Sequence, residues 1–326
     1  MRAIQIERTG GPDVLRPTTV EVGEPGPGEV RVRHYACGVN FIDTYHRTGL
    51  YPLPLPAILG VEGAGVVEAI GPGVTHIAVG NRVAYATPRP GSYAESRVLP
   101  AMPVVRIPDD LDFERAAALM LKGLTVQYLL RRTRPQRELE PGDFIVWHAA
   151  AGGVGLIACQ WARALGFQLI ATAGSRDKCD LALRHGAAHA IDYRTEDVVA
   201  RVREITGNAG VKVVYDSVGK DTWERSLDCL QPLGLMVSFG NASGPVPPVN
   251  LGQLAAKGSL HVTRPTLFTH LATREVTDAM TAELFALVTA GTITIDPPRR
   301  YALDDAVQAH RDLEARSTTG SLVLVP

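Results

Sequence analysis

A run of small residues, HAAAGGVG at positions 148–155, constrains the fold more than any other feature of this chain. Residues 144–147 before it are apolar, as in a buried strand, and the residues from Leu156 onward open a helical pattern. The turn has the spacing A-x-x-G-x-x-G. Residues without bulk let the backbone approach a phosphate closely, and the N–H groups at a helix start favour negative charge. The segment therefore predicts a floor for a dinucleotide pyrophosphate, formed by Ala151, Gly152, Gly153 and Val154, with a turn that is tight only for packing as the alternative.

The next segment indicates which dinucleotide. A second apolar strand is expected at residues 168–172, where NAD-binding folds usually place an acidic residue for the ribose hydroxyls. The chain offers no such residue there, and instead supplies a hydroxyl and cations suited to the 2′-phosphate of NADPH, at Gly174, Ser175, Arg176 and Lys178, with Tyr193 expected nearby. The alternative is that Arg176 and Lys178 are solvated charges in the first turn of a helix, and Asp177 would fit that alternative as well.

Length and composition limit the remaining possibilities. A chain of 326 residues predicts two domains, and a net charge of −1 gives no field that would attract nucleic acid or an anionic membrane. We expect a cytoplasmic protein, because no stretch resembles a signal peptide or a membrane span. The four cysteines are far apart, which argues against a disulfide framework. His34 and Cys37 fall in an alternating, strand-like segment without further ligands nearby, so we expect no metal site.

The periodicity changes along the chain and predicts an α/β architecture. Residues 1–123 have short alternating runs and many turn signals, which indicate a β-rich domain. Helical patterns follow at 113–121 and, as a link between domains, at 123–132. Strands then alternate with helices as in a doubly wound parallel sheet, with strands expected at 144–147, 168–172, 190–193, 211–216, 235–239 and 260–263. The tail, with helices near 277–290 and 304–315 and a strand at 321–325, is expected to complete the first domain. The predicted domains are thus 1–123 with 265–326, and 124–264.

Several motifs together resemble one family over essentially the whole chain. They are GGPDVL (10–15), GVNFIDTYHRTGLYP (38–52), LGVEGAGVV (59–67), KGLTVQYLL (122–130), HAAAGGVG, VVYDSVG (213–219), LMVSFGN (235–241) and VTRPTL (262–267). The chain is similar to the zinc-independent, ζ-crystallin-like quinone oxidoreductases of the medium-chain dehydrogenase/reductase superfamily. The resemblance implies a GroES-like catalytic domain, a Rossmann domain that binds NADPH, and a homodimer, for which the edge segment 259–264 would let two Rossmann sheets pair.

The resemblance also shows what is missing. Metal-dependent relatives hold a catalytic zinc with a cysteine in G-V-C-x-x-D and a histidine in G-H-E, and here those positions are Asn40 and Val61. The implied function is NADPH-dependent reduction of a quinone without a metal, because an electron-poor acceptor needs only hydrogen-bond support for its developing oxyanion. The same fold leaves a zinc-free alkenal, enone or enoyl thioester reductase as the nearer alternative, and a non-enzymatic RNA-binding or structural protein as the distant one.

The resemblance further implies site residues. Asn40, Tyr45 and Tyr51 are the catalytic candidates, as donors of hydrogen bonds or a proton to the acceptor, although Asn40 could instead bind the nicotinamide ribose and Tyr51 could be an aromatic lid. Asp43 is expected to bind backbone or ribose, and Glu62 to be either loop scaffolding or a remnant of the zinc-site frame. The remaining predicted cofactor contacts are Asn40, Phe41, Ile42, Asp43, Thr125, Val126, Ser217, Val218, Phe239, Gly240, Asn241, Ser243, Pro265, Thr266, Leu267 and Arg316.

Overall fold

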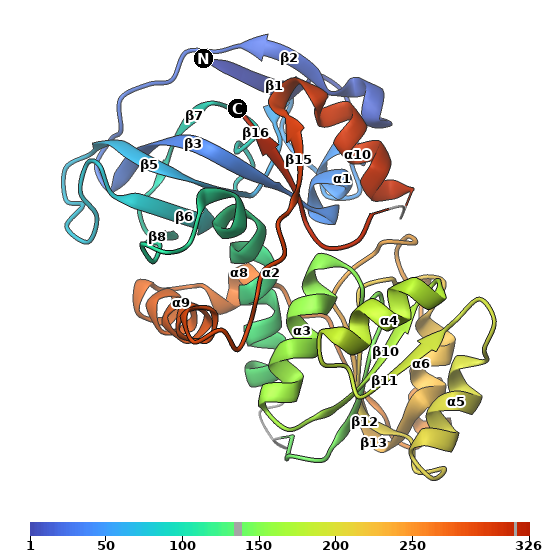
Figure 1. The fold of residues 1–326 in the computed structure, drawn as a ribbon. Helices are drawn as coiled ribbons and strands as arrows, with labels where there is room; N and C mark the ends of the chain where they lie inside the picture. Colours follow the sequence, from blue (N-terminus) through green and yellow to red (C-terminus); the bar gives the residue numbers. More distant parts are fainter. Residues whose placement is uncertain (134–138, 316–317) are drawn as a thin grey trace. The chain divides into compact units, whose positions relative to one another are not determined.

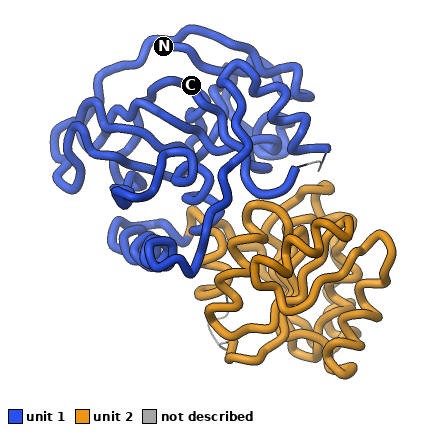
Figure 2. Tube along the Cα trace, viewed as in Figure 1, with its two compact units in different colours: residues 1–124, 270–326 blue, residues 125–269 orange. Residues whose placement is uncertain are grey.

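The computed structural model describes residues 1–133, 139–315 and 318–326, and the chain divides into two compact units (Figure 2). Unit 1 contains residues 1–124 and 270–326, and unit 2 contains residues 125–269. The sequence predicts domain boundaries at 123/124 and 264/265, whereas the observed units change at 124/125 and 269/270 along the chain.

Unit 2 is built on a six-stranded parallel sheet with the strand order β11-β10-β9-β12-β13-β14 (Figure 1). The strands are β9 (Phe144–Trp147), β10 (Gln168–Ala173), β11 (His189–Asp192), β12 (Val211–Asp216), β13 (Leu230–Ser238) and β14 (His261–Thr263). The order reverses between β9 and β12, and ligands of such sheets bind at the carboxyl ends of the strands at this reversal. The predicted doubly wound parallel sheet is confirmed.

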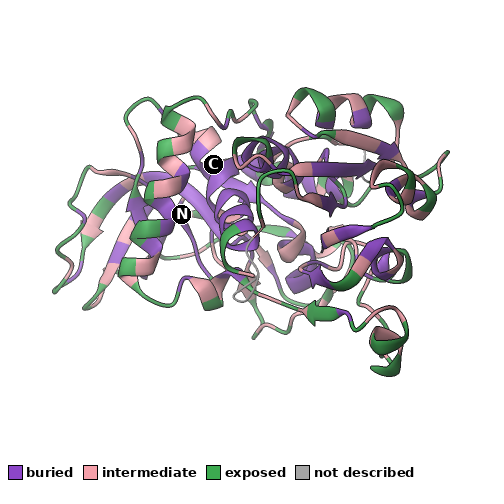
Figure 3. Ribbon diagram, turned by 90° about the horizontal axis from the view of Figure 1, so that it is seen from below, coloured by how far each residue is buried: buried purple, intermediate pink, exposed green. Residues whose placement is uncertain are grey.

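Helices cover this sheet in pairs. They are α3 (Gly153–Ala164), α4 (Arg176–Arg184), α5 (Val198–Ile205) and α6 (Trp223–Cys229). The short helices α7 (Gly252–Ala256) and α8 (Leu267–His270) come later in the chain, and the last residue of α8 already belongs to unit 1. Val202 of α5 and Leu227 of α6 join one core cluster with Val146, Ile170 and Val214 of the sheet. Helices α3 and α4 pack beside each other and against β10. Figure 3 shows the buried residues running along the strands.

Unit 1 contains a seven-stranded sheet of order β15-β16-β3-β5-β6-β8, with β7 paired to β3, and a three-stranded sheet of order β2-β1-β4. The strands are β1 (Arg2–Ile6), β2 (Arg16–Thr19), β3 (Glu29–Val39), β4 (Ala57–Ile58), β5 (Glu62–Ile70), β6 (Arg82–Ala86), β7 (Ser96–Pro100), β8 (Val104–Arg106), β15 (Arg299–Ala302) and β16 (Leu322–Val325). The helices are α1 (Phe41–Thr48), α9 (Arg274–Thr289) and α10 (Ala306–Glu314), with single 3₁₀ turns η1 (Pro12–Val14) and η2 (Leu303–Asp305). Helix α2 (Phe113–Arg132) begins in unit 1 and ends in unit 2.

The end of the chain returns to the beginning of unit 1. Strand β16 pairs antiparallel with the end of β3, with Leu322 opposite Val39 and Leu324 opposite Cys37. Leu313 and Leu322 also enter one core cluster with Ile4 and other residues from the first hundred positions. The strand that leads to Asn40 is therefore held by the last strand of the chain.

Two local predictions were wrong. The patterns at 113–121 and 123–132 form one helix, α2, rather than two. Gly123, expected as the first residue of the linking helix, lies inside α2, and a Cβ there would approach Leu284 of α9 to 2.7 Å, so the glycine permits a close helix contact. Strand β13 begins at Leu230 instead of residue 235, because a register shift against β12 absorbs the turn-like residues 231–234.

Across the part of the chain that the structure describes, no helix is long and apolar enough to cross a membrane.

Candidate functional site

The predicted pyrophosphate floor lies between β9 and α3 in unit 2. The N–H groups in the first turn of a helix have no acceptor within the helix. Gly152, the N-cap of α3, has no side chain that could accept from them. Ala150 is tied to the neighbouring strand by its N–H, which donates to Thr172 O at 3.1 Å. The turn thus presents helix N–H donors on a backbone that is fixed from behind, as phosphate binding requires.

Two positions explain why small residues are needed in this turn. A Cβ on Gly155 would approach the backbone oxygen of Ala150 to 2.4 Å, a distance that real Cβ atoms do not reach. Ala149 has φ 54°, in the left-handed region that costs an alanine about 1 kcal/mol or more. Gly155 therefore permits the contact between helix and strand, and Ala149 accepts strain where the motif often has glycine.

A buried polar network lies at the strand ends next to this turn. His148 contacts Thr172 Oγ1 through Nδ1 (2.8 Å) and Ser226 Oγ through Nε2 (2.9 Å), and Ser226 donates to Asp216 Oδ2 (2.9 Å). Burial lowers the pKa of His148 and keeps the imidazole neutral. Because the Ser226 proton goes to Asp216, His148 donates from Nε2 and accepts at Nδ1. The network joins the ends of β9, β10 and β12 to α6.

Asp216 also organises the loop that follows β12. Its Oδ1 accepts from the N–H groups of Val218 (2.7 Å) and Gly219 (3.0 Å), and its Oδ2 accepts from Thr222 Oγ1 (2.7 Å). His148 and Asp216 are not among the residues predicted for the site. Their positions next to the glycine turn and at the end of a strand were the available signal.

The loops after β12 and β13 pair with each other. The Ser243 hydroxyl donates to Val218 O at 2.8 Å, and a Cβ on Gly240 would approach Ser217 O to 2.4 Å. The structure thus brings together one predicted group of residues, namely Ser217, Val218, Phe239, Gly240, Asn241 and Ser243. A second predicted group, Pro265, Thr266 and Leu267, follows β14, where Leu267 opens α8.

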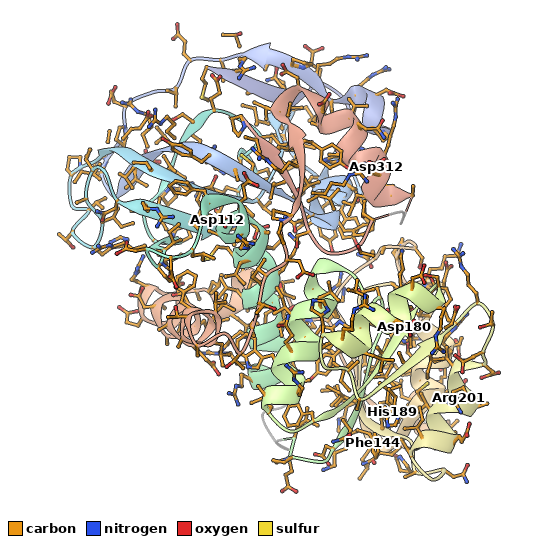
Figure 4. All side chains as sticks on the ribbon, viewed as in Figure 1. Asp112, Phe144, Asp180, His189, Arg201 and Asp312 are labelled. Carbon is orange, nitrogen blue, oxygen red and sulfur yellow. The ribbon has the colours of Figure 1, made fainter. Side chains whose placement is uncertain are left out.

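The expected adenosine end lies at the carboxyl ends of β10 and β11. Ser175 caps α4 by accepting the Lys178 N–H at 3.4 Å, and the Tyr193 hydroxyl lies so close to Gly174 that a Cβ there would be 2.5 Å away. Arg176 is 84% exposed and pairs with Asp180 of α4 at 3.1 Å (Asp180 is labelled in Figure 4). All five predicted residues, Gly174, Ser175, Arg176, Lys178 and Tyr193, therefore share this edge of the sheet, and β10 ends at Ala173 without an acid.

In unit 1 the candidate residue Asn40 is bonded to a buried carboxylate, Glu62. Strands β3 and β5 are antiparallel with Cys37 opposite Gly63, so the end of β3 lies beside the start of β5. Glu62 Oε2 accepts from Asn40 Nδ2 (2.8 Å) and from Lys122 Nζ (3.4 Å), and its Oε1 accepts the Leu121 N–H (2.6 Å). Gly38 gives the carboxylate its space, because a Cβ there would be 2.2 Å from Oε2. Of the two alternatives for Glu62, the structure favours scaffolding: it fixes the Asn40 amide.

Asp43 is fully buried and holds the same turn. Its Oδ2 accepts from the Asn40 N–H and from the Tyr93 hydroxyl, each at 2.9 Å, whereas Oδ1 has no hydrogen-bond partner among the described residues. Burial raises the pKa of Asp43 to about 7. Of the two expected roles, the contact with backbone is the one observed here.

Aromatic side chains follow on α1 and in the segment after it, where Tyr51 lies. Tyr45 and Tyr51 meet edge to face with ring centroids 5.2 Å apart, and the Tyr51 N–H donates to Tyr45 O at 3.0 Å. His46 lies 6.0 Å from Tyr51 by the same measure, and burial lowers its pKa to about 4. Phe41 and Ile42 are half-buried in the first turn of α1.

Three of the predicted contact residues remain. Thr125 and Val126 are on α2, one turn after Lys122, and so share its helix face. Arg316 lies outside the described residues.

The residues in the zinc positions do not fit a zinc ion. Val61 is fully buried and has no ligand atom, and the Asn40 amide nitrogen is already bonded to Glu62. Cys37 donates its thiol proton to Ser92 O, and burial raises its pKa to about 12, which disfavours the thiolate that a metal would need. Within residues 1–133, 139–315 and 318–326, no three His, Cys, Asp or Glu side chains form a group that could hold a metal.

Comparison with known proteins gives full-length similarities. Residues 26–109 match the alcohol dehydrogenase GroES-like domain, and residues 153–282 match the model described as zinc-binding dehydrogenase. The chain is 58% identical over 326 residues to a quinone oxidoreductase of Pseudomonas aeruginosa, covering 100% of this chain and 99% of the relative. It is 45% identical to a 2-haloacrylate reductase of Burkholderia, with 99% and 98% covered.

A solved structure has the same fold. The crystal structure of Escherichia coli quinone oxidoreductase complexed with NADPH superposes with a TM-score of 0.97, at 51% identity and with 100% of both chains covered. Together with the family models, this confirms the predicted fold class, a GroES-like domain plus a Rossmann domain.

Proposed function

Since the chain belongs to the quinone oxidoreductase family, we propose that it transfers reducing equivalents from NADPH to a quinone without a metal. The observation that carries the proposal is the strand, glycine turn and helix of unit 2 together with an adenosine edge that offers hydroxyls and cations in place of an acid. That chemistry suits the 2′-phosphate that distinguishes NADPH from NADH.

We assign the cofactor's parts to separate segments. The first turn of α3, at Ala151, Gly152, Gly153 and Val154, would bind the pyrophosphate through backbone N–H groups, and Ser175, Arg176, Lys178 and Tyr193 would bind the 2′-phosphate. The remaining part of the cofactor would be bound by the paired loops that begin at Ser217 and Phe239, by the segment at Pro265, and by Thr125 and Val126. Asn40, Phe41 and Ile42 would face the nicotinamide end. NADPH supplies the hydride that this chain's own side chains cannot provide.

The acceptor end would work by hydrogen bonding. A quinone oxygen gains negative charge as it is reduced, and fixed donors stabilise that charge. Tyr45 and Tyr51 carry phenol donors, and Asn40 is a polar group whose amide is oriented by Glu62. A fixed amide loses no further freedom when the acceptor binds, so positioning is the main contribution of these residues.

A second acceptor class has a specific observation in its favour. The 2-haloacrylate reductase that is 45% identical over the full chain is named for a substrate with an activated carbon–carbon double bond. A zinc-free reductase of enones, alkenals or enoyl thioesters is therefore the alternative function on the same scaffold.

Oxidation of NADPH and NADH, followed by nicotinamide absorbance, tests the proposal with a benzoquinone, a naphthoquinone, an enone and 2-chloroacrylate, each with and without EDTA. We expect quinone turnover that prefers NADPH and resists the chelator. Turnover of the enone or of 2-chloroacrylate alone would move the protein to the second class, and loss of activity with EDTA would refute the metal-free mechanism.

We also propose a homodimer formed by pairing at β14. This edge strand exposes His261 and Val262, and an unpaired edge is a natural site for association. Light scattering after size exclusion should give twice the chain mass, and Val262→Pro should shift the protein toward monomer, because proline cannot donate to a strand ladder. A monomeric wild-type protein would contradict this assembly.

A further inference from the structure

A chain of buried hydrogen bonds runs to Asp43 from residues far away in the sequence. Arg47 Nη1 contacts His310 Nδ1 at 2.9 Å, His310 Nε2 contacts the Tyr93 hydroxyl at 3.0 Å, and Tyr93 contacts Asp43 Oδ2 at 2.9 Å. Arg47 belongs to α1, Tyr93 to the segment between β6 and β7, and His310 to α10. All four side chains are buried, and the function proposed above does not use these hydrogen bonds.

The chemistry of the members fixes the direction of every bond. Arginine has only donors, so His310 accepts at Nδ1. Burial lowers the pKa of His310 to about 3, so the imidazole is neutral and its single proton is on Nε2. His310 then donates to the Tyr93 oxygen, which leaves the Tyr93 hydroxyl proton for Asp43. The chain therefore ends with a donor aimed at Asp43, which favours the carboxylate over the acid.

Asp43 passes this constraint to the turn that holds Asn40. The same Oδ2 accepts the Asn40 N–H at 2.9 Å, while the Asn40 side chain donates to Glu62 at 2.8 Å. The backbone of Asn40 is thus held from one side and its amide from the other. A hydrogen bond to an ionised acceptor is about twice as strong as one to a neutral acceptor, so the hold on Asn40 depends on Asp43 being charged.

We propose that Tyr93 and His310 are positioning residues of the reductase reaction: they keep Asp43 a carboxylate, and the carboxylate fixes the Asn40 turn for acceptor and nicotinamide. The inference rests on the proposed function, because it gives Asn40 its role there. It adds residues from two further segments, one of them from the tail of the chain.

The charges around Asp43 set the expected pH range. Burial is the largest influence and raises its pKa, the Glu62 charge also raises it, and the bonds from Asn40 and Tyr93 and the Lys122 charge lower it, with a pKa of about 7 as the result. The nearby Cys37 thiol stays neutral because burial raises its pKa to about 12, and Arg47 acts through His310. Turnover should therefore decrease as the pH is lowered through neutrality, because Asp43 takes up a proton. This part of the pH profile of kcat is the acid limb.

The decisive variant is Tyr93→Phe, which removes one donor to the carboxylate and leaves the ring in place. Loss of a hydrogen bond to a charged group should raise the pKa of Asp43 by about one to two units. We expect the acid limb of kcat to move upward by that amount, with turnover recovered at alkaline pH. A merely structural role would lower activity or melting temperature without moving the limb.

Tyr85→Phe is the matched control. Tyr85 is equally buried, and its hydroxyl also meets a buried histidine, His34 Nε2 at 2.8 Å. His34 is neutral, with its pKa lowered by burial to about 4, and gives its proton to Ala94 O, so Tyr85 donates to an imidazole and not to a carboxylate. The variant should lose stability as Tyr93→Phe does, with its acid limb unmoved. A limb that shifts equally in both variants would overturn the assignment.

Further measurements separate this inference from the proposed function. His310→Leu should shift the limb upward, and His310→Gln, whose amide can still donate, should shift it less. The carboxyl ¹³C titration of Asp43 should show the same displacement in Tyr93→Phe even if no acceptor is turned over, in which case only the proposed function fails. If the pKa of Asp43 shifts in Tyr93→Phe while the acid limb of kcat does not, the positioning role is wrong.

Discussion

Gly155→Ala is the sharpest test of the cofactor floor in unit 2. The added Cβ would lie 2.4 Å from Ala150 O, while ordinary contact begins at 3.4 Å, so α3 must move by about 1 Å from the strand end. Ala150 cannot yield easily, because it is fully buried and its N–H is bonded to Thr172 O. We expect a loss of about 1 to 3 kcal/mol in the free energy of unfolding, typical of overpacking.

The displacement of α3 should also weaken the binding of NADPH. The N–H groups of the first α3 turn move with the helix, and loss of one charge-assisted hydrogen bond costs about 1.5–3 kcal/mol, which raises Kd on the order of ten- to a hundredfold. Gly152→Ala is the contrasting variant, since its Cβ would meet only Ala149 O at 3.3 Å within 4 Å and its φ of −82° suits alanine. Gly152→Ala should change the free energy of unfolding by less than about 1 kcal/mol. It should nevertheless weaken the binding of NADPH, because the added methyl group would face the expected position of the pyrophosphate.

Both quantities can be measured in the intact protein. The chain has three tryptophans, Trp147, Trp161 and Trp223, all in unit 2, so tryptophan fluorescence during urea unfolding reports on the unit that carries the substitutions. NADPH affinity can be read by calorimetry. Wild-type stability in Gly155→Ala would refute the tight contact, and wild-type affinity in Gly152→Ala would refute the pyrophosphate assignment.

Three further predictions concern single side chains. Because the pKa of Asp43 is raised to about 7, the stabilisation that its protonated form gives is present at low pH and is lost as pH rises toward about 7. The free energy of unfolding of the wild type, measured with urea relative to Asp43→Asn, should therefore fall by about 3 kcal/mol between about pH 5 and about pH 8. A difference between the two proteins that does not change with pH would contradict this prediction. Lys178→Ala should raise KM for NADPH about tenfold and leave KM for NADH nearly unchanged, whereas equal effects would remove Lys178 from the 2′-phosphate site. Tyr51→Phe should lower kcat by less than about 100-fold, because a larger loss would make it an obligatory proton donor.

The architecture of unit 2 could be read from the sequence because its signals are local. A buried parallel strand appears as an apolar run, and the glycine turn follows it directly, so β9 and β10 were placed to within one residue. The helical pattern was expected from Leu156, and α3 begins three residues earlier, at Gly153. The error in α2 has a long-range cause. The helix was expected to begin at Gly123, because a sequence does not show that Leu284 packs against that position.

The buried partners in unit 1 could not be predicted in this way. Asn40 and Asp43 were named as candidates, but Tyr93 lies 50 positions after Asp43, and His310 lies 217 positions after Tyr93. No periodicity links such residues, because their meeting depends on the pairing of β16 with β3 and on the packing of α10. A histidine in a helical pattern reads as an ordinary half-buried residue until its partners are known.

These contacts give the returning tail a role beyond completing a sheet. Strand β16 holds β3 up to Val39, the residue before Asn40, and α10 supplies His310 to the donor chain that ends at Asp43. Arg47 is anchored to the same helix by Glu314 Oε1 at 2.6 Å, and to the N-terminal segment by Gly10 O at 3.0 Å. The Asn40 turn is thus constrained by the beginning, the middle and the end of unit 1 at once. Because each link is a directed hydrogen bond between buried groups, a substitution at either terminus of the chain can change the acceptor site without touching it.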